Sequence, residues 1–311
     1  MSEPAQVPVA PPSKGAAFLR RLLSFTVLWG VVLGCLFWGN RTVSDYVFLI
    51  ILVFLAAAGL QEFYGMVRKL GHACYAREGI LGGVLLLGAT FCYVSGRLGS
   101  AAPPSRVNDF ETSFFILFVL GLCIRQFVSR HTTTGIIAIA TTLLGLMYVP
   151  WLLNFIQKIN FFGRPADGHY AVEGHYYVLY FVVVTKLADC GAYGVGTLIG
   201  RHKMIPRISP GKTWEGFCGA VVLSTAASVI FARVAGGHLS GMTPWHAVVL
   251  GGVLSIGAVV GDLIESLFKR EAGLKDSGRL FPGIGGILDL LDSLLFNAPL
   301  MYLYLRHVLT P

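Results

Sequence analysis

Charged side chains are scarce in this sequence. Asp, Glu, Lys and Arg together make up 13% of the 311 residues, about half of the ~25% that is usual in soluble domains. Hydrophobic residues make up 55% and come in runs of roughly 20 residues, the length that crosses a bilayer. Strand-like alternation of apolar and polar residues is lacking, which argues against a membrane β-barrel. The sequence is therefore typical of an all-α, polytopic integral membrane protein.

Cysteine is also sparse, and its spacing lacks the patterns that bind metals or form redox pairs. The six cysteines show no CxxC or Cys/His spacing, and most fall in predicted helices, where we expect small buried apolar side chains. The net charge of +8 comes from basic residues between the apolar runs. Basic residues there set membrane topology and meet anionic lipid or substrate, so we expect no nucleic-acid partner.

Nine apolar runs are each close to the ~20 residues that cross the hydrocarbon core. We expect helices over residues 19–38, 44–66, 79–97, 112–128, 134–157, 174–199, 214–234, 243–268 and 286–306. The connections 98–111 and 158–173 contain Gly, Pro and Asn and are predicted to be plain outer loops. The chain divides into a Pro- and Ala-rich, disordered N-terminus (1–17), an N-terminal region of about five helices (18–170) and a C-terminal region of about four (171–311).

The distribution of basic residues predicts how the chain is oriented. With the N-terminus in the cytoplasm, 16 of the 24 Lys and Arg residues fall on the cytoplasmic side, as the positive-inside rule requires. We therefore expect a multi-pass protein of the cell (inner) membrane with its C-terminus outside. The charge-rich stretches 200–215 and 269–285 both fall on the cytoplasmic side, which indicates that they form one site.

The first cluster of chemical interest lies inside a predicted helix. Lys186, Asp189 and Tyr193 share one helix face at 100° per residue. Ionisable residues within a membrane span are energetically costly and usually face a partner or a wet cavity. We interpret the cluster as part of a site, and the alternative is a Lys–Asp pair that only orients helices.

The second cluster is the polar stretch 200–216, predicted to be a connection between helices. It contains cations, Ser209 and Thr213, and Glu215 begins the next helix. Hydroxyl groups and cations beside a helix N-terminus suit phosphate oxygens. The GxxxxGK[ST] pattern of a P-loop is absent, and the alternative is a basic loop that only follows the topology rule.

The third cluster lies at the end of the chain, over residues 255–293. Asp262, Ser266 and Lys269 line one face of a helix, and Asp289 and Asp292 are spaced i, i+3 on the last span. Two carboxylates at that spacing can hold a divalent cation together with phosphate oxygens and water. Alternatively, these carboxylates pair with nearby cations, namely Lys186, Lys269 or Arg270.

The third cluster carries a family resemblance. The run S-L-F-K-R-x4-K-D-S-G-x-x-x-P-G-x-G-G-x-L-D-x-x-D-S at 266–293 resembles the phosphatidate cytidylyltransferase (CDP-diacylglycerol synthase) family. D-C-G-A-Y at 189–193, S-P-G-K-T-W-E-G at 209–216 and G-D-L-I-E-S at 261–266 are similar to the same family, in the same order. The resemblance is dense over about 180–300 and diffuse in the N-terminal half, where only hydrophobic spans correspond.

The resemblance implies a membrane-embedded homodimer that converts CTP and phosphatidate into CDP-diacylglycerol and pyrophosphate in phospholipid biosynthesis. We expect the cofactor to be Mg²⁺, as one ion or as two ions of which one is monovalent, bound by Asp262, Asp289 and Asp292. The implied catalytic residues are Asp189, Asp262, Lys269, Arg270, Asp289 and Asp292. The implied nucleotide-binding residues are Ser209, Lys212, Thr213, Ser266, Lys275 and Asp276.

Two departures from the family pattern fall within its most diagnostic segment. The family usually has His at the position of Ile284 and Arg at the position of Leu290, so an active site would rely on neighbours such as Arg279. The alternatives are another CTP-dependent lipid enzyme (a polyprenol kinase or an archaeal-type lipid cytidylyltransferase), a membrane transporter and an inactive homologue. A transporter should show repeat symmetry, whereas the polar residues here crowd into the C-terminal half.

Overall fold

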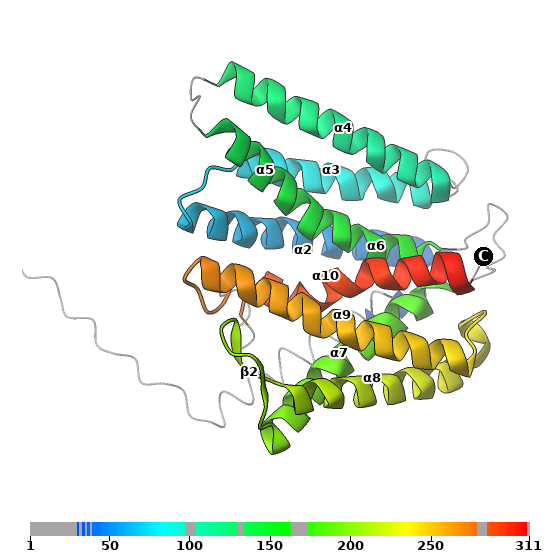
Figure 1. Cartoon of the computed structure of the whole chain (residues 1–311). Coiled ribbons are helices and arrows are strands. Elements are labelled where there is room, and N and C mark those ends of the chain that lie inside the picture. Colours follow the sequence, from blue (N-terminus) through cyan, green and yellow to red (C-terminus); the bar gives the residue numbers. More distant parts are fainter. Residues whose placement is uncertain are drawn as a thin grey trace, which may run out of the picture.

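The structure of the chain is a computed structural model. It describes residues 39–96, 104–129, 134–162, 173–278 and 285–309, together with isolated positions between 30 and 37. Figure 1 shows a bundle of long helices with a small β-hairpin at one end. The described elements are α2 (Arg41–Lys69), α3 (Ala76–Val94), α4 (Pro104–Val128), α5 (Gly135–Leu146), α6 (Leu152–Asn160), α7 (Gly174–Ile199), β1 (Lys203–Ile205), β2 (Ser209–Thr213), α8 (Trp214–Ala235), α9 (Pro244–Glu271) and α10 (Ile287–Tyr304), with short π- or 3₁₀-helical turns at Met147–Trp151, Gly236–His238 and Leu305–Leu309.

The helices are long and apolar enough to cross a membrane. Within the described residues there are 8 such spans, with α5, the π turn and α6 forming one of them. They correspond to eight of the nine expected helices, and the largest difference is at α4, which begins at Pro104 instead of residue 112. The first expected span, 19–38, lies almost wholly outside the described residues, as do residues 1–17. The prediction of an all-α, multi-pass membrane protein is confirmed.

Caps define where the helices of the C-terminal half begin. Thr213 precedes α8, and its side chain accepts a hydrogen bond from the backbone N–H of Gly216 (3.1 Å). Thr243 precedes α9 and accepts from the N–H of His246 (3.3 Å), while Pro244 takes the first helical position. A threonine cap satisfies one of the orphan amides of the first turn, and proline at that position gives up no hydrogen bond.

One prediction about the connections is wrong. The segments 98–111 and 158–173 were expected to be plain outer loops, but α4 already includes Glu111 and α6 extends through Lys158. These two side chains form a buried ion pair of 2.6 Å with only 7% and 3% exposure. Glu111 also accepts from Asn154 Nδ2 (2.7 Å). The charges neutralise each other and are hydrogen-bonded, which is the condition for burying them.

The largest hydrophobic cluster of the described residues joins the two halves of the chain. Leu60 of α2, Leu153 of α6, Tyr180 of α7, Leu250 of α9 and Leu288 of α10 belong to one cluster of buried side chains. Helices in a bilayer associate through close packing, because lipid is as apolar as their side chains. The N-terminal helices therefore pack directly against the region that carries the polar clusters.

The stretch 200–216 forms a β-hairpin, where only a polar connection was expected. Strands β1 and β2 pair antiparallel, with Lys203 opposite Thr213. Glu215 fastens the base of the hairpin by accepting from the backbone N–H groups of Arg201 (3.1 Å) and His202 (3.2 Å). The hairpin projects at the end of the bundle where α9 ends (Figure 1).

Candidate active site

A cavity of about 450 Å³ lies between α7, the hairpin, α8, α9 and α10. Carboxylates, ammonium groups and hydroxyls all contribute to its wall. Its lining consists of Lys186, Asp189, Ala192, Tyr193, Gly196, Thr197, Met204, Ser209, Gly211, Lys212, Thr213, Gly216, Phe217, Val259, Asp262, Asp289 and Asp292. All three predicted clusters thus contribute to one cavity.

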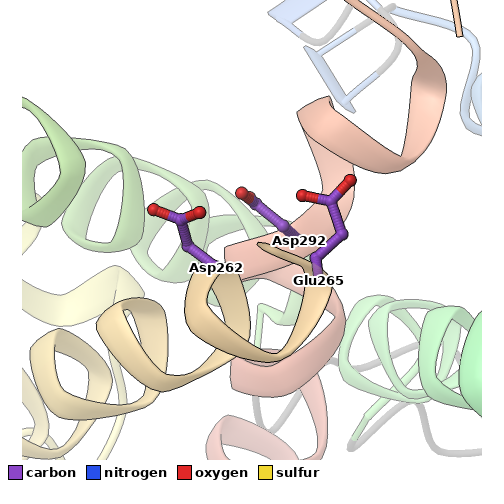
Figure 2. A group of neighbouring side chains, drawn as sticks. All are labelled: Asp262, Glu265 and Asp292. Carbon is purple, nitrogen blue, oxygen red and sulfur yellow. The ribbon is translucent and has the colours of Figure 1, made fainter. Parts of the chain in front are cut away.

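Three carboxylates converge at the junction of α9 and α10, and we call these three residues the acidic group. Asp262 and Glu265 of α9 and Asp292 of α10 each offer an oxygen within 4.8 Å of the others, and Figure 2 shows their side chains gathered at this junction. Glu265 is 1% exposed. Its Oε1 is buried with no hydrogen-bond partner among the described residues. Three carboxylates so close, one with an orphaned oxygen, are suited to hold a cation.

A glycine allows α9 and α10 to approach closely enough to form this group. A Cβ atom at Gly261 would lie 2.6 Å from the backbone oxygen of Asp292 and 2.9 Å from Cβ of Phe296. Gly257, one turn earlier, faces Asn297 of α10 with similar closeness. The residue before Asp262 is therefore small because the partner helix occupies the space that a side chain would need.

Lys186 and Asp189 form a network with α10, as their shared helix face predicts. The Nζ of Lys186 donates to Oδ2 of Asp189 (3.3 Å), to the carbonyl of Leu290 (3.0 Å) and to Oγ of Ser293 (3.0 Å). Ser293 in turn donates to Oδ2 of Asp189 (3.0 Å). The pair does connect helices, and both members also line the cavity. Their role in a functional site stays a prediction.

The hairpin supplies a cation to the acidic group. Lys212 of β2 lies 2.8 Å from Oδ2 of Asp262 and donates to the carbonyl of Val259 (3.0 Å). Ser266 donates to Oδ1 of Asp262 (3.3 Å). Ser209 and Thr213 lie on the same strand as Lys212 and line the cavity. The residues predicted to bind phosphate thus lie next to Asp262, which is predicted to bind the metal.

Asp289 is engaged differently from Asp292. Its Oδ1 accepts from Nζ of Lys269 (2.6 Å), and its Oδ2 accepts from the N–H groups of Gly286 (2.7 Å) and Ser277 (3.0 Å). Lys269 also pairs with Oε2 of Glu265 (2.8 Å). Pairing with Lys269 was the alternative interpretation of Asp289, and it is the contact that the structure shows. A direct metal contact by Asp289 stays a prediction.

Three predicted residues are not part of the described wall of the 450 Å³ cavity. Arg270 is directed to the backbone, donating to the carbonyls of Ile208 and Leu274 (both 3.3 Å). Lys275 and Asp276 are exposed and line a second cavity, of about 690 Å³, beside the end of α2. Their predicted roles in catalysis or nucleotide binding stay predictions. Leu290 is described, and its carbonyl receives Lys186, whereas Arg279 and Ile284 lie outside the described residues.

The charges of the site favour a bound cation. Three described ammonium groups, on Lys186, Lys212 and Lys269, face five carboxylates. The carboxylates are Asp189, Asp262, Glu265, Asp289 and Asp292. With every group ionised, the described site carries an excess of negative charge that a divalent cation would balance.

The predicted site omitted Glu265. It lies three residues after Asp262 on the same helix, and a carboxylate within a membrane span is by itself a reason to expect a functional partner. Glu265 also lies four residues before Lys269, and a glutamate at that spacing commonly forms a helix-stabilising pair. The sequence pattern therefore has a structural interpretation as well as a functional one.

Comparison with known proteins finds relatives over most of the chain. Phosphatidate cytidylyltransferases of Mycobacterium bovis and Mycobacterium tuberculosis are each 33% identical to this chain over 247 residues, which is 78% of the chain and 76% and 71% of the respective relative. A phosphatidate cytidylyltransferase of Staphylococcus haemolyticus is 36% identical over 193 residues, 62% of the chain and 66% of that protein. The sequence model of the cytidylyltransferase family matches residues 19–308, nearly the whole chain. The chain therefore belongs to the cytidylyltransferase family.

Proposed function

We propose that this enzyme transfers a cytidylyl group from CTP to phosphatidate and forms CDP-diacylglycerol and pyrophosphate, a step of phospholipid biosynthesis. The observation that carries the proposal is the meeting of Asp262, Glu265 and Asp292 with Lys212 in one cavity at an end of the helix bundle. The names of the relatives support the same reaction.

The reaction is a phosphoryl-type displacement. An oxygen of the phosphatidate phosphate attacks the α-phosphorus of CTP, the bond from that phosphorus to the bridging oxygen breaks, and pyrophosphate leaves with the electron pair. Such reactions depend on positioning and charge stabilisation. The lipid phosphate is largely deprotonated near neutral pH (second pKa ~6 for a phosphate monoester), so the site needs no strong general base.

The acidic group is the proposed metal site, with Asp262, Glu265 and Asp292 as ligands. Bound Mg²⁺, as one ion or with a second, monovalent ion, would neutralise charge on the phosphates. Lys186 and Ser293 hold Asp189 beside this group, which suits Asp189 to orient it or to add a ligand.

The cations and hydroxyls are proposed to bind the triphosphate. Lys212 can exchange its contact with Asp262 for a phosphate oxygen once a metal neutralises that carboxylate. Ser209 and Thr213 lie on the same strand and present hydroxyl groups. Lys269, held by Asp289, would stabilise the charge of the leaving pyrophosphate.

Arg270, Lys275 and Asp276 lie at the same end of the bundle, where CTP would approach. Ser266 orients Asp262 through a hydrogen bond. We place this end in the cytoplasm and the C-terminus outside, because basic residues concentrate here. A nucleotide would then arrive from water while the lipid arrives sideways past Tyr193 and Phe217 of the cavity wall. We propose the inner membrane as the location and a homodimer as the assembly, as the family resemblance implies.

Product analysis tests the proposal. Purified protein in detergent is given labelled CTP, phosphatidate and Mg²⁺, and CDP-diacylglycerol and pyrophosphate are measured together. We expect the two products in equal amounts and none when EDTA removes the metal. Release of CDP instead of pyrophosphate would identify a lipid kinase, and absence of any product would identify an inactive homologue.

A further inference from the structure

A carboxylate from the N-terminal half reaches the start of the last helix. Glu62 lies on α2, yet its Oε1 accepts from the backbone N–H of Ile287 (2.9 Å) and its Oε2 from that of Leu288 (3.0 Å). Oε2 also accepts from the hydroxyl of Ser277 (2.9 Å). More than 200 residues of chain separate Glu62 from these partners.

The contact with Glu62 satisfies two backbone N–H groups in the first turn of α10. The first N–H groups of a helix have no partner within the helix, and their partial positive charge favours an anion. Glu62 supplies both an acceptor and a negative charge from a neighbouring helix. The fit is close, because a Cβ atom at Gly278 would lie 2.2 Å from Oε1 of Glu62, and one at Gly286 would lie 2.4 Å from Oε2.

The hydrogen bonds continue from Glu62 to the acidic group. Ser277 lies between two carboxylates, contacting Glu62 and Oδ2 of Asp289 (both 2.9 Å). Asp289 then pairs with Lys269, which pairs with Glu265. The path is continuous whichever carboxylate receives the hydroxyl hydrogen of Ser277, because the backbone N–H of Ser277 also donates to Asp289 (3.0 Å).

Glu62 itself does not face the described wall of the 450 Å³ cavity. It lines the second cavity, on the side of Ser277 and Gly278. A group that contacts the backbone of α10, and not the cavity that would hold the substrates, acts through other residues.

We infer that Glu62 is a positioning residue, which holds the start of α10 and thereby sets Asp289 and Asp292 for the proposed transfer. The inference rests on the proposed function for its catalytic consequence. It gives the N-terminal half of the chain a direct part in shaping the site.

The test compares Glu62→Gln with Glu62→Asp and with Glu78→Gln, the same chemical change at a glutamate of α3 that pairs with the half-exposed Arg125. The glutamine keeps the size but loses the charge and turns an N–H group toward the helix amides. We expect Glu62→Gln to lower kcat about 10–100-fold per folded molecule and to raise the Mg²⁺ concentration for half-maximal rate. Glu62→Asp, which keeps the charge, should retain more activity, and Glu78→Gln should match the wild type.

Amide hydrogen exchange supplies a readout that needs no activity. Without substrates, Glu62→Gln should exchange faster than the wild type in peptides covering residues 285–292, while peptides of α8 stay unchanged. A variant that is less stable but keeps its kcat, its Mg²⁺ dependence and this protection would overturn the inference. If the wild type makes no CDP-diacylglycerol, the proposed function fails, and exchange still decides whether Glu62 holds the start of α10.

Discussion

The carboxylates of the site differ in what neutralises them, and that difference favours different roles. Asp289 has Lys269 and two backbone N–H groups, and Asp189 has Lys186 and Ser293. Glu265 keeps one buried oxygen with no partner among the described residues, and Asp292 faces it from α10. Glu265, which keeps a spare oxygen, and Asp292 beside it are therefore suited to a metal, whereas Asp289, with both oxygens hydrogen-bonded, is suited to orientation.

Asp292→Asn tests this assignment. The amide retains the size of the side chain but removes one negative charge from the acidic group, so the metal should bind more weakly. We expect activity to fall by about 100-fold or more, since loss of even an indirect metal partner costs 10–100-fold. The rate measured against Mg²⁺ concentration checks the prediction. Asp109→Asn, the same chemical change at an exposed position of α4, serves as the control and should behave as the wild type.

The packing of α9 against α10 decides whether the acidic group forms at all. Asp262 and Glu265 come from one helix and Asp292 from the other. Their distance therefore depends on how closely the backbones approach at Gly261. The hairpin also shapes the site, because β2 places Lys212 beside Asp262. The cap at Thr213 marks the point where β2 ends and α8 begins.

Gly261→Ala should disrupt the site at the level of the two helices. Alanine gains about 1 kcal/mol of helix propensity, but overpacking a close contact costs about 1–3 kcal/mol, and here the contact is the backbone of Asp292 at 2.6 Å. We expect the helices to separate and activity to fall about 10-fold or more, since small displacements of positioned groups cost up to ~100-fold. Gly252→Ala on the same helix, where nothing lies within 4 Å, gains the propensity without the contact.

Both variants are compared by activity per folded molecule and by thermal unfolding in detergent. Equal activity of the alanine variants at positions 261 and 252 would contradict the argument from close approach. A gain in unfolding temperature for Gly252→Ala alone would confirm that the propensity term is present and that the contact outweighs it at Gly261.

The whole molecule has a predicted orientation that labelling can test. Arg207 lies on the hairpin, at the end of the bundle proposed to be cytoplasmic, and Gly237 lies on the exposed turn after α8 at the other end. In a background without native cysteines, an impermeant thiol reagent on intact cells should label Gly237→Cys and spare Arg207→Cys. Labelling only Arg207→Cys would reverse the proposed topology.

Replacing the native cysteines is a precaution for this experiment. Cys123, Cys190 and Cys218 are exposed in the structure. Burial raises the pKa of the Cys74 thiol, so little of it is present as the reactive thiolate. After permeabilisation both introduced cysteines should react, which shows that the hairpin position is accessible in the folded protein.

Much of this protein follows from sequence alone, because membrane crossing is a local property. A run of about 20 apolar residues predicts a span, and the structure contains the eight expected spans that fall in its described part. The facing of Lys186, Asp189 and Tyr193 also followed from helix periodicity. The loops at Glu111 and Lys158 were mispredicted because their charges, polar in sequence, neutralise each other when the helices meet.

Tertiary structure decided which polar residues share a site and in what role. The i, i+3 spacing in the sequence suggested that Asp289 and Asp292 act together. In the folded protein Asp289 pairs with Lys269, and Glu265 lies beside Asp292. Glu62 could not be connected to Ile287 from sequence, since no local pattern links positions 225 residues apart. The length of an apolar run and the helical period are local properties that can be determined from the sequence. The pairing of charges depends on the distance between helices. That distance is set by contacts such as the one at Gly261.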